Sequence, residues 1–157
     1  MIILGIDPGF AKTGYGVVEN KERKLLHCAH GVIVSSRTMA HSKRLLHLQN
    51  SLQEIIQTYK PDRIAVEDLF IHKNMKTAIK VGEARGVILV TGVRNNVRVC
   101  EFTPLQIKQA LTGYGRASKH QMQKMVQFFL QLPALPKPDD AADALAAAIC
   151  CSNIYGE

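Results

Sequence analysis

The chain has 157 residues, of which 46% are hydrophobic, and this is enough for a single domain, residues 1–157, with a buried core. Its net charge of +7 and isoelectric point near 9.4 indicate a polyanionic partner, most often nucleic acid, although a basic protein without such a partner is the alternative. The apolar stretches are far shorter than a membrane span, no signal peptide is recognisable and the four cysteines lack metal spacing. We therefore expect a cytoplasmic protein with reduced thiols and no membrane segment.

The first predicted element is a strand that ends at Asp7. Four of the five residues at positions 2–6 are aliphatic, a pattern typical of a central strand buried on both faces. Pro8 cannot donate a hydrogen bond to a sheet and Gly9 permits a turn, so a carboxylate stands at the mouth of the strand. Aspartate also opens Asx-turns, and this is the structural interpretation of Asp7. A functional interpretation requires other carboxylates to converge on it.

Two further strands, at residues 13–18 and 25–34, are expected to form an antiparallel meander with the first. Within the later strand, His27, Cys28 and His30 superficially resemble a metal-binding cluster. On a regular strand, however, His27 and Cys28 would point to opposite faces of the sheet. The pattern therefore disfavours a zinc site.

Leucine and isoleucine residues at helical spacing predict a helix at residues 41–59. A short apolar stretch at residues 64–66 then predicts a buried strand, and Glu67 ends it. An acidic residue at the end of a second central strand repeats the situation of Asp7. The neighbouring Asp68 is either a supporting group or a solvated charge.

A helix is predicted at residues 74–94, and one of its faces is unusually bare. Ala78, Gly82 and Gly86 lie four residues apart, so this stripe has almost no side chains. Each glycine costs a helix about 1 kcal/mol relative to alanine, which close approach of another backbone would offset. Two candidates for that backbone remain open: the protein's own sheet, or a second copy of the chain in a two-fold dimer.

A fifth strand is predicted at residues 97–102, and two helices follow it. Thr103 and Ser118 each begin a capping-box pattern, in which a glutamine stands three residues later. The turn between these helices, residues 113–116, reads Gly-Tyr-Gly-Arg and is flexible, basic and aromatic. Such a turn suits contact with phosphates, although a solvated surface is the alternative.

The last helix is predicted to run from about residue 140 to residue 153, and it carries two further carboxylates. Asp139 and Asp140 could simply cap the helix, whereas Asp143 lies a turn inside among alanines. The spacing places Asp140 and Asp143 on one face. The small residues Ala144, Ala147 and Cys151 share that side, and the bulkier Leu145 and Ile149 form an opposite stripe.

Asp7, Glu67, Asp140 and Asp143 are therefore candidates for one acidic cluster. Like charges at close range cost several kcal/mol unless a cation neutralises them or their pKa values rise. Oxygen ligands favour Mg²⁺, with Mn²⁺ as a substitute, and a site with several carboxylates can hold two such ions about 4 Å apart. In a basic protein, hydrolysis of a nucleic-acid phosphodiester is the matching reaction.

The sequence resembles the RuvC family of Holliday-junction resolvases over nearly its whole length. The segments that carry the resemblance are Met1-Ile-Ile-Leu-Gly-Ile-Asp-Pro-Gly9, Ala65-Val-Glu67 with Phe70 and Lys73-Asn74, Glu83-Ala-Arg-Gly86, Thr103-Pro-Leu-Gln-Ile-Lys108 with Lys119, and Asp140-Ala-Ala-Asp143-Ala-Leu145. The resemblance implies an α/β fold of the ribonuclease-H-like type, in which helices flank a mixed five-stranded sheet. It also implies an endonuclease that acts as a homodimer and resolves four-way DNA junctions by paired, Mg²⁺-dependent nicks during recombination and repair.

By position, the resemblance implies that Asp7, Glu67, Asp140 and Asp143 are the catalytic and metal-binding carboxylates. It further implies DNA contacts by an aromatic residue that meets the junction bases and by basic residues, and it suggests RuvA and RuvB as branch-migration partners. The extra acid Asp139 leaves open which member of the Asp139–Asp140 pair binds metal. The expected DNA-binding residues are Phe70, Lys73, Lys108, Arg116 and Lys119.

Two other functions remain open. Asp7-Pro-Gly9 followed by Thr13-Gly-Tyr-Gly16 also suggests the phosphate loop of actin-like and sugar-kinase proteins, although those ATPases normally need two such lobes. The other possibility is a non-catalytic module that binds junctions through basic residues and holds its acidic cluster for structural reasons. Phe70 likewise has a structural interpretation, as an apolar residue packed beneath its loop.

Overall fold

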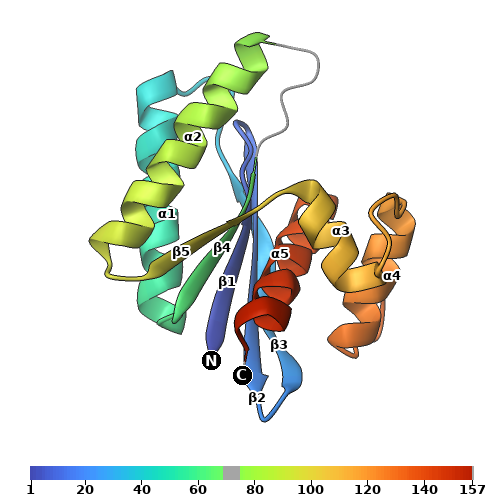
Figure 1. Ribbon diagram of the computed structural model, residues 1–157. Coiled ribbons are helices and arrows are strands. Elements are labelled where there is room, and N and C mark those ends of the chain that lie inside the picture. The colour runs from blue at the N-terminus through green and yellow to red at the C-terminus, as the bar shows by residue number, and fades with distance from the viewer. Residues whose placement is uncertain (69–74, 157) are drawn as a thin grey trace.

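The computed structural model describes residues 1–68 and 75–156, with only the backbone described at residues 75 and 76. A mixed sheet stands between two layers of helices in this part of the chain (Figure 1). The elements are, in chain order, β1 (Ile2–Asp7), β2 (Lys12–Lys21), β3 (Lys24–Val34), α1 (His41–Tyr59), β4 (Arg63–Glu67), α2 (Met75–Arg94), β5 (Arg98–Phe102), α3 (Pro104–Thr112), α4 (Lys119–Phe129) and α5 (Asp139–Tyr155).

The sheet has the strand order β3-β2-β1-β4-β5. The first three strands form the predicted antiparallel meander, whereas β4 and β5 run parallel to β1. Thr103 and Ser118 make the predicted capping boxes at the starts of α3 and α4, each with the glutamine three residues later. The structure thus confirms the expected mixed five-stranded sheet flanked by helices.

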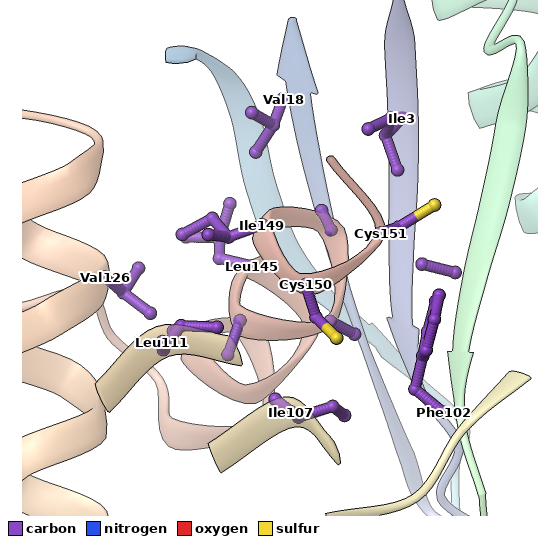
Figure 2. Close-up of a cluster of buried hydrophobic side chains, with 14 of the residues drawn as sticks. Ile3, Val18, Phe102, Ile107, Leu111, Val126, Leu145, Ile149, Cys150 and Cys151 are labelled. Carbon is purple, nitrogen blue, oxygen red and sulfur yellow. The ribbon is translucent and has the colours of Figure 1, made fainter. Parts of the chain in front are cut away.

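Alternation along the strands divides the core into two parts. Leu4 and Ile6 of β1 pack against α1 and α2 on one face, whereas Ile3 packs against α5 on the other. Behind α5 lie α3 and α4, so α5 is enclosed between the sheet and a further pair of helices (Figure 1). Figure 2 shows its side chains meeting those of β1 and β2 on one side and those of α3 and α4 on the other.

Helix α5 lies unusually close to the sheet, because three strand glycines leave room for it. A Cβ at Gly14 would overlap the backbone carbonyl of Asp140, and one at Gly5 would overlap that of Ala144. At Gly16, a Cβ would lie 2.7 Å from the side chain of Leu145. These glycines are therefore required by packing, since any side chain would push the helix away from β1 and β2.

Helix α5 is buried on every side from residue 141 to residue 152 except at Asp143, and its Leu145 faces Gly16 of the sheet. One expectation about a helix face needs correction. On α2, a Cβ at Gly82 or Gly86 would meet nothing within 4 Å. The glycine stripe therefore does not pack on the protein's own sheet, and that explanation of it is wrong.

The strand pattern also missed an irregularity in β3. The β2–β3 register shifts between Val17 and Val18, so that Val17 pairs with Ala29 and Val18 pairs with His27. This β-bulge brings the rings of His27 and His30 together, with Nε2 of His27 lying 2.7 Å from Nδ1 of His30. A regular strand would have placed side chains three positions apart on opposite faces.

Candidate active site

Asp7 and Glu67 occupy equivalent positions at the ends of two neighbouring parallel strands. Ile6 pairs with Val66, so the next residue of each strand is a carboxylate at the same edge of the sheet. Strand alternation places Asp7 on the face of Ile3 and Gly5, and places Glu67 on the face of Ala65. This is the face that α5 covers, so both carboxylates lie beneath the first turns of that helix.

Helix α5 brings Asp140 and Asp143 to the same place. Asp7 pairs with Gly14 across β1 and β2, and the carbonyl of Asp140 rests directly on Gly14. Close packing at this glycine thus fixes the start of α5 beside the end of β1. Asp143, one turn further along, lines a hollow of about 270 Å³ with Glu67, Lys108 and Lys119, and its apolar walls come from α3, α4 and α5.

The pKa values of Asp7 and Glu67 indicate that these carboxylates interact electrostatically. Burial raises the pKa of Asp7 from its ordinary 3.8 to about 8, and the charges of Glu67, Asp143 and Asp140 add to the effect. Burial, followed by the charge of Asp143, raises the pKa of Glu67 from 4.5 to about 7. Two half-buried carboxyls with raised pKa values at one strand edge are typical of a functional site.

Lys119 supplies the positive charge nearest to this cluster. Its Nζ lies 3.2 Å from an oxygen of Asp143 and 3.3 Å from an oxygen of Asp139. Burial raises the pKa of Asp143 and outweighs the opposing effect of Lys119. Burial alone would lower the pKa of Lys119, but the neighbouring aspartates raise it, so this side chain remains charged.

The two adjacent aspartates at the start of α5 have different surroundings. Asp139 is exposed, and it accepts a hydrogen bond of 2.9 Å from Nε2 of Gln123 and pairs with Lys119, which lowers its pKa. Asp140 is half-buried, and its charge acts on Asp7. These differences favour Asp140 as the member of the pair that belongs to the cluster.

The remaining predicted DNA contacts are placed only in part. Lys108 lines the same hollow as Glu67, and its charge lowers the pKa of that carboxyl. Arg116 is exposed in the turn between α3 and α4, and it does not line the hollow. Phe70 and Lys73 lie outside the described residues, so the structure does not place them.

Two arginines that sequence reasoning did not identify hold the loops of the site. Arg85 of α2 pairs with Asp68, at 3.1 Å, and with Glu101 of β5, which ties the residue after Glu67 to two other elements. Asp68 therefore takes part in an ion pair, with 44% of its side chain exposed. Arg44 of α1 is buried, donates to the carbonyl of Phe10 at 3.2 Å and stacks on its ring at 3.7 Å. The signal for Arg44 was a lone arginine within an amphipathic helix.

The donor chemistry fits a hard divalent cation, because the four candidate ligands offer only carboxylate oxygens. Within the part of the chain that the structure describes, no three His, Cys, Asp or Glu side chains are close enough together to form a metal-binding group. Burial is the main cause of the raised pKa values of Asp7 and Glu67, and repulsion by neighbouring carboxylates, which for Glu67 is that of Asp143, adds to the effect. A bound cation would relieve that repulsion.

Comparison with known proteins identifies the family. A family model described as crossover junction endodeoxyribonuclease RuvC matches residues 3–151. RuvC of Caldicellulosiruptor saccharolyticus is 55% identical over 153 residues, covering 96% of this chain and 91% of the relative. RuvC of Ruminiclostridium cellulolyticum is 51% identical over 155 residues, covering 99% and 93%.

Solved structures agree with this assignment. Thermus thermophilus RuvC has a TM-score of 0.93 at 33% identity and covers 99% of this chain and 96% of its own. The same protein in complex with a Holliday junction substrate has a TM-score of 0.91 at 30% identity, with the same coverage. The yeast mitochondrial Holliday junction resolvase Ydc2, at 16% identity and a TM-score of 0.70, shares the fold alone. The expected ribonuclease-H-like fold is confirmed, and the chain belongs to the RuvC family of crossover junction endodeoxyribonucleases.

Proposed function

We propose that this protein resolves Holliday junctions by paired nicks in opposed DNA strands, as part of recombination and DNA repair. The observation that carries the proposal is the convergence of Asp7, Glu67, Asp140 and Asp143 at one strand edge of a basic protein. The structure of Thermus thermophilus RuvC with a Holliday junction substrate, which resembles this chain closely, supports the choice of substrate.

Four-way junctions are cut by hydrolysis of a phosphodiester, and the four carboxylates would hold Mg²⁺, or Mn²⁺ in its place, with two ions per site. When bound, these ions would supply an activated water and neutralise charge on the leaving oxygen. Asp7 and Glu67 would orient them from the sheet, and Asp140 and Asp143 from α5. The oxygen-rich donor set and the raised pKa values of Asp7 and Glu67 support this assignment.

The basic residues around the hollow would hold the DNA. Lys108 and Lys119 would contact the phosphates beside the bond that is cut, and their interactions with carboxylates of the cluster support this proposal. Arg116 would contact the backbone further out, from its exposed turn. For Phe70 and Lys73 the proposal rests on the resemblance of their sequence to the family.

The working unit would be a homodimer that meets through α2. The exposed stripe of α2 combines two glycines, Gly82 and Gly86, with three apolar side chains. These are Ile79, Val90 and Val93, which are 58%, 58% and 67% exposed. Apolar residues beside glycines allow two helices to approach closely and bury their surface. A symmetric pair would present two cutting sites to the two-fold axis of a junction.

The cellular setting follows from the same family. RuvA and RuvB would deliver the junction, and the cytoplasm would be the compartment. All four cysteines in the described chain are free thiols, which supports a reducing environment. None of the described helices is long and apolar enough to cross a membrane.

The two alternative functions have less support. A phosphate loop would need open backbone at Thr13-Gly-Tyr-Gly16, but Gly14 and Gly16 are covered by α5. A non-catalytic module would have no reason to gather carboxylates with raised pKa values beside lysines. It remains distinguishable by experiment, because it would bind junctions equally well with and without metal and would leave them uncut.

The test offers a synthetic four-way junction and a linear duplex of the same sequence to the wild type and to Asp7→Asn, with and without Mg²⁺. We expect the wild type to nick only the junction, symmetrically and only with metal, whereas Asp7→Asn binds the junction but leaves it intact. Cleavage of the linear duplex at a similar rate, or cutting by Asp7→Asn, would contradict the proposal.

A further inference from the structure

A groove of about 1370 Å³ lies at the opposite end of α5 from the carboxylates. One wall is the start of β3, the other is the last turn of α4 with the residues that follow it, and the end of α5 contributes Ser152 and Asn153. Asp143 and Ser152 are nine residues apart, which is about 14 Å along a helix. An occupant of this groove would therefore leave the cutting site accessible.

The groove combines exposed apolar side chains with positive charge. Phe128 on the α4 side is 72% exposed, and Leu26 on the β3 side is 45% exposed. Neither side chain belongs to the buried core. Arg23, Lys24 and Lys124 add positive charge, and the groove is lined by no aspartate or glutamate of the described chain. A segment that alternates acidic and apolar residues would complement this lining.

The β3 wall also offers backbone hydrogen bonds. β3 is an edge strand, since β2 is its only neighbour among the described strands. The register shift opposite residues 27–29 bends the strand, so the regular edge beside the groove is confined to residues 24–27. Edge strands with free N–H and C=O groups pair readily with an extended peptide, and side-chain pockets beside the edge then select its sequence.

We propose that this groove binds a short, extended, acidic-apolar segment of a partner protein, which adds a strand to β3 beside residues 24–27. Junction DNA is the competing occupant. The leucine and phenylalanine walls favour a peptide, because a duplex presents charged phosphates that would leave these apolar side chains exposed to water. The surface would attach the enzyme to another protein while its carboxylates face the DNA.

The experiment titrates the full-length wild-type protein into a fluorescein-labelled octapeptide of alternating glutamate and leucine and follows anisotropy. Two matched peptides serve as controls: one with lysine in place of glutamate, and one whose backbone amides are N-methylated at alternate positions so that they cannot donate to β3. We expect saturable binding of the glutamate peptide, and at least about fivefold weaker binding of both controls.

The protein variants are Phe128→Ser and Lys24→Glu, with Leu46→Ser as the control, because Leu46 is also an exposed apolar residue but lies on α1 across the sheet. Phe128→Ser and Lys24→Glu should each weaken peptide binding at least about fivefold and leave junction affinity and cleavage within about twofold of wild type. Circular dichroism checks that each variant is folded. The proposal would be overturned if the glutamate peptide did not bind saturably or if the control peptides bound equally well. A loss of junction affinity in both groove variants would also overturn it, because that result would show that the groove binds DNA.

Discussion

Among single residues, Asp7 shows most clearly how burial and neighbouring charges act on the site. Burial and three neighbouring carboxylates raise its pKa to about 8, whereas in the unfolded chain it ionises near 3.8. Between these pH values the folded protein binds more protons than the unfolded chain does. The contribution of Asp7 to the free energy of unfolding is therefore greatest below pH 3.8 and is lost as the pH rises toward 8.

This linkage predicts how Asp7→Asn behaves in metal-free buffer. The variant should be more stable than wild type at pH 8, by on the order of 1–3 kcal/mol, and the difference should shrink toward pH 5. Millimolar Mg²⁺ should also reduce it, by stabilising the wild type. Urea denaturation at each pH measures the difference, and Asp139→Asn is the control, since Asp139 is exposed. A difference that does not change with pH would show that Asp7 does not carry this electrostatic cost.

The neighbouring aspartates of α5 allow a matched comparison of activity. Asp143 is half-buried in the hollow, whereas Asp139 is exposed, does not line the hollow and contacts Lys119 and Gln123. Asp143→Asn should reduce junction cleavage more than about 100-fold with junction affinity preserved, because affinity comes from the basic groups. Asp139→Asn should change cleavage less than about threefold. If the two variants lost cleavage activity equally, Asp143 could not be assigned to the cluster in preference to Asp139.

At the scale of elements, the position of α5 on the sheet determines whether the carboxylates meet. A methyl group at Gly14 would overlap the carbonyl of Asp140, which cannot move without the helix. Gly14→Ala should therefore lower the free energy of unfolding by at least about 2 kcal/mol and impair cleavage in the protein that remains folded. Gly82→Ala is the control, because its added methyl meets nothing in the chain.

Gly82→Ala should leave stability unchanged or raise it by up to about 1 kcal/mol, since alanine favours a helix. Both variants are compared by urea denaturation at a dilution where the chain is monomeric. If Gly14→Ala were as stable as Gly82→Ala, close packing of α5 would not be what places Asp140 beside Asp7.

Much of this arrangement could be predicted from the sequence. Asp7 and Glu67 each follow an apolar stretch that predicts a strand. The capping boxes at Thr103 and Ser118 are also local patterns, so these features could be predicted without knowledge of distant contacts. The burial of α5 could not be predicted as well, because the stripe of Leu145 and Ile149 indicates one core-facing side, whereas the small residues around it allow every side to be buried. The bulge beside His27 and the buried contacts of Arg44 depend on neighbours far along the chain, which periodicity does not show.

For the whole molecule, the α2 stripe should decide the oligomeric state. Because Gly82 is open within the chain, Gly82→Leu should fold normally, and the bulky side chain should keep two stripes apart. Sedimentation at micromolar concentration should find the wild type as a dimer and Gly82→Leu as a monomer. The monomer should nick junctions singly instead of in pairs. A monomeric wild type in the presence of junction DNA would rule out the dimer, and a dimeric Gly82→Leu would show that the interface lies elsewhere.

The central claim is that Asp7, Glu67, Asp140 and Asp143 together hold divalent cations at one edge of the sheet. Anomalous diffraction from crystals of the protein soaked in Mn²⁺ tests it most directly. The account predicts two peaks about 4 Å apart, bounded by these carboxylates, and their loss in Asp7→Asn crystals of the same form. Anomalous density only at the His27–His30 pair, or carboxylates without any peak at saturating Mn²⁺, would contradict it.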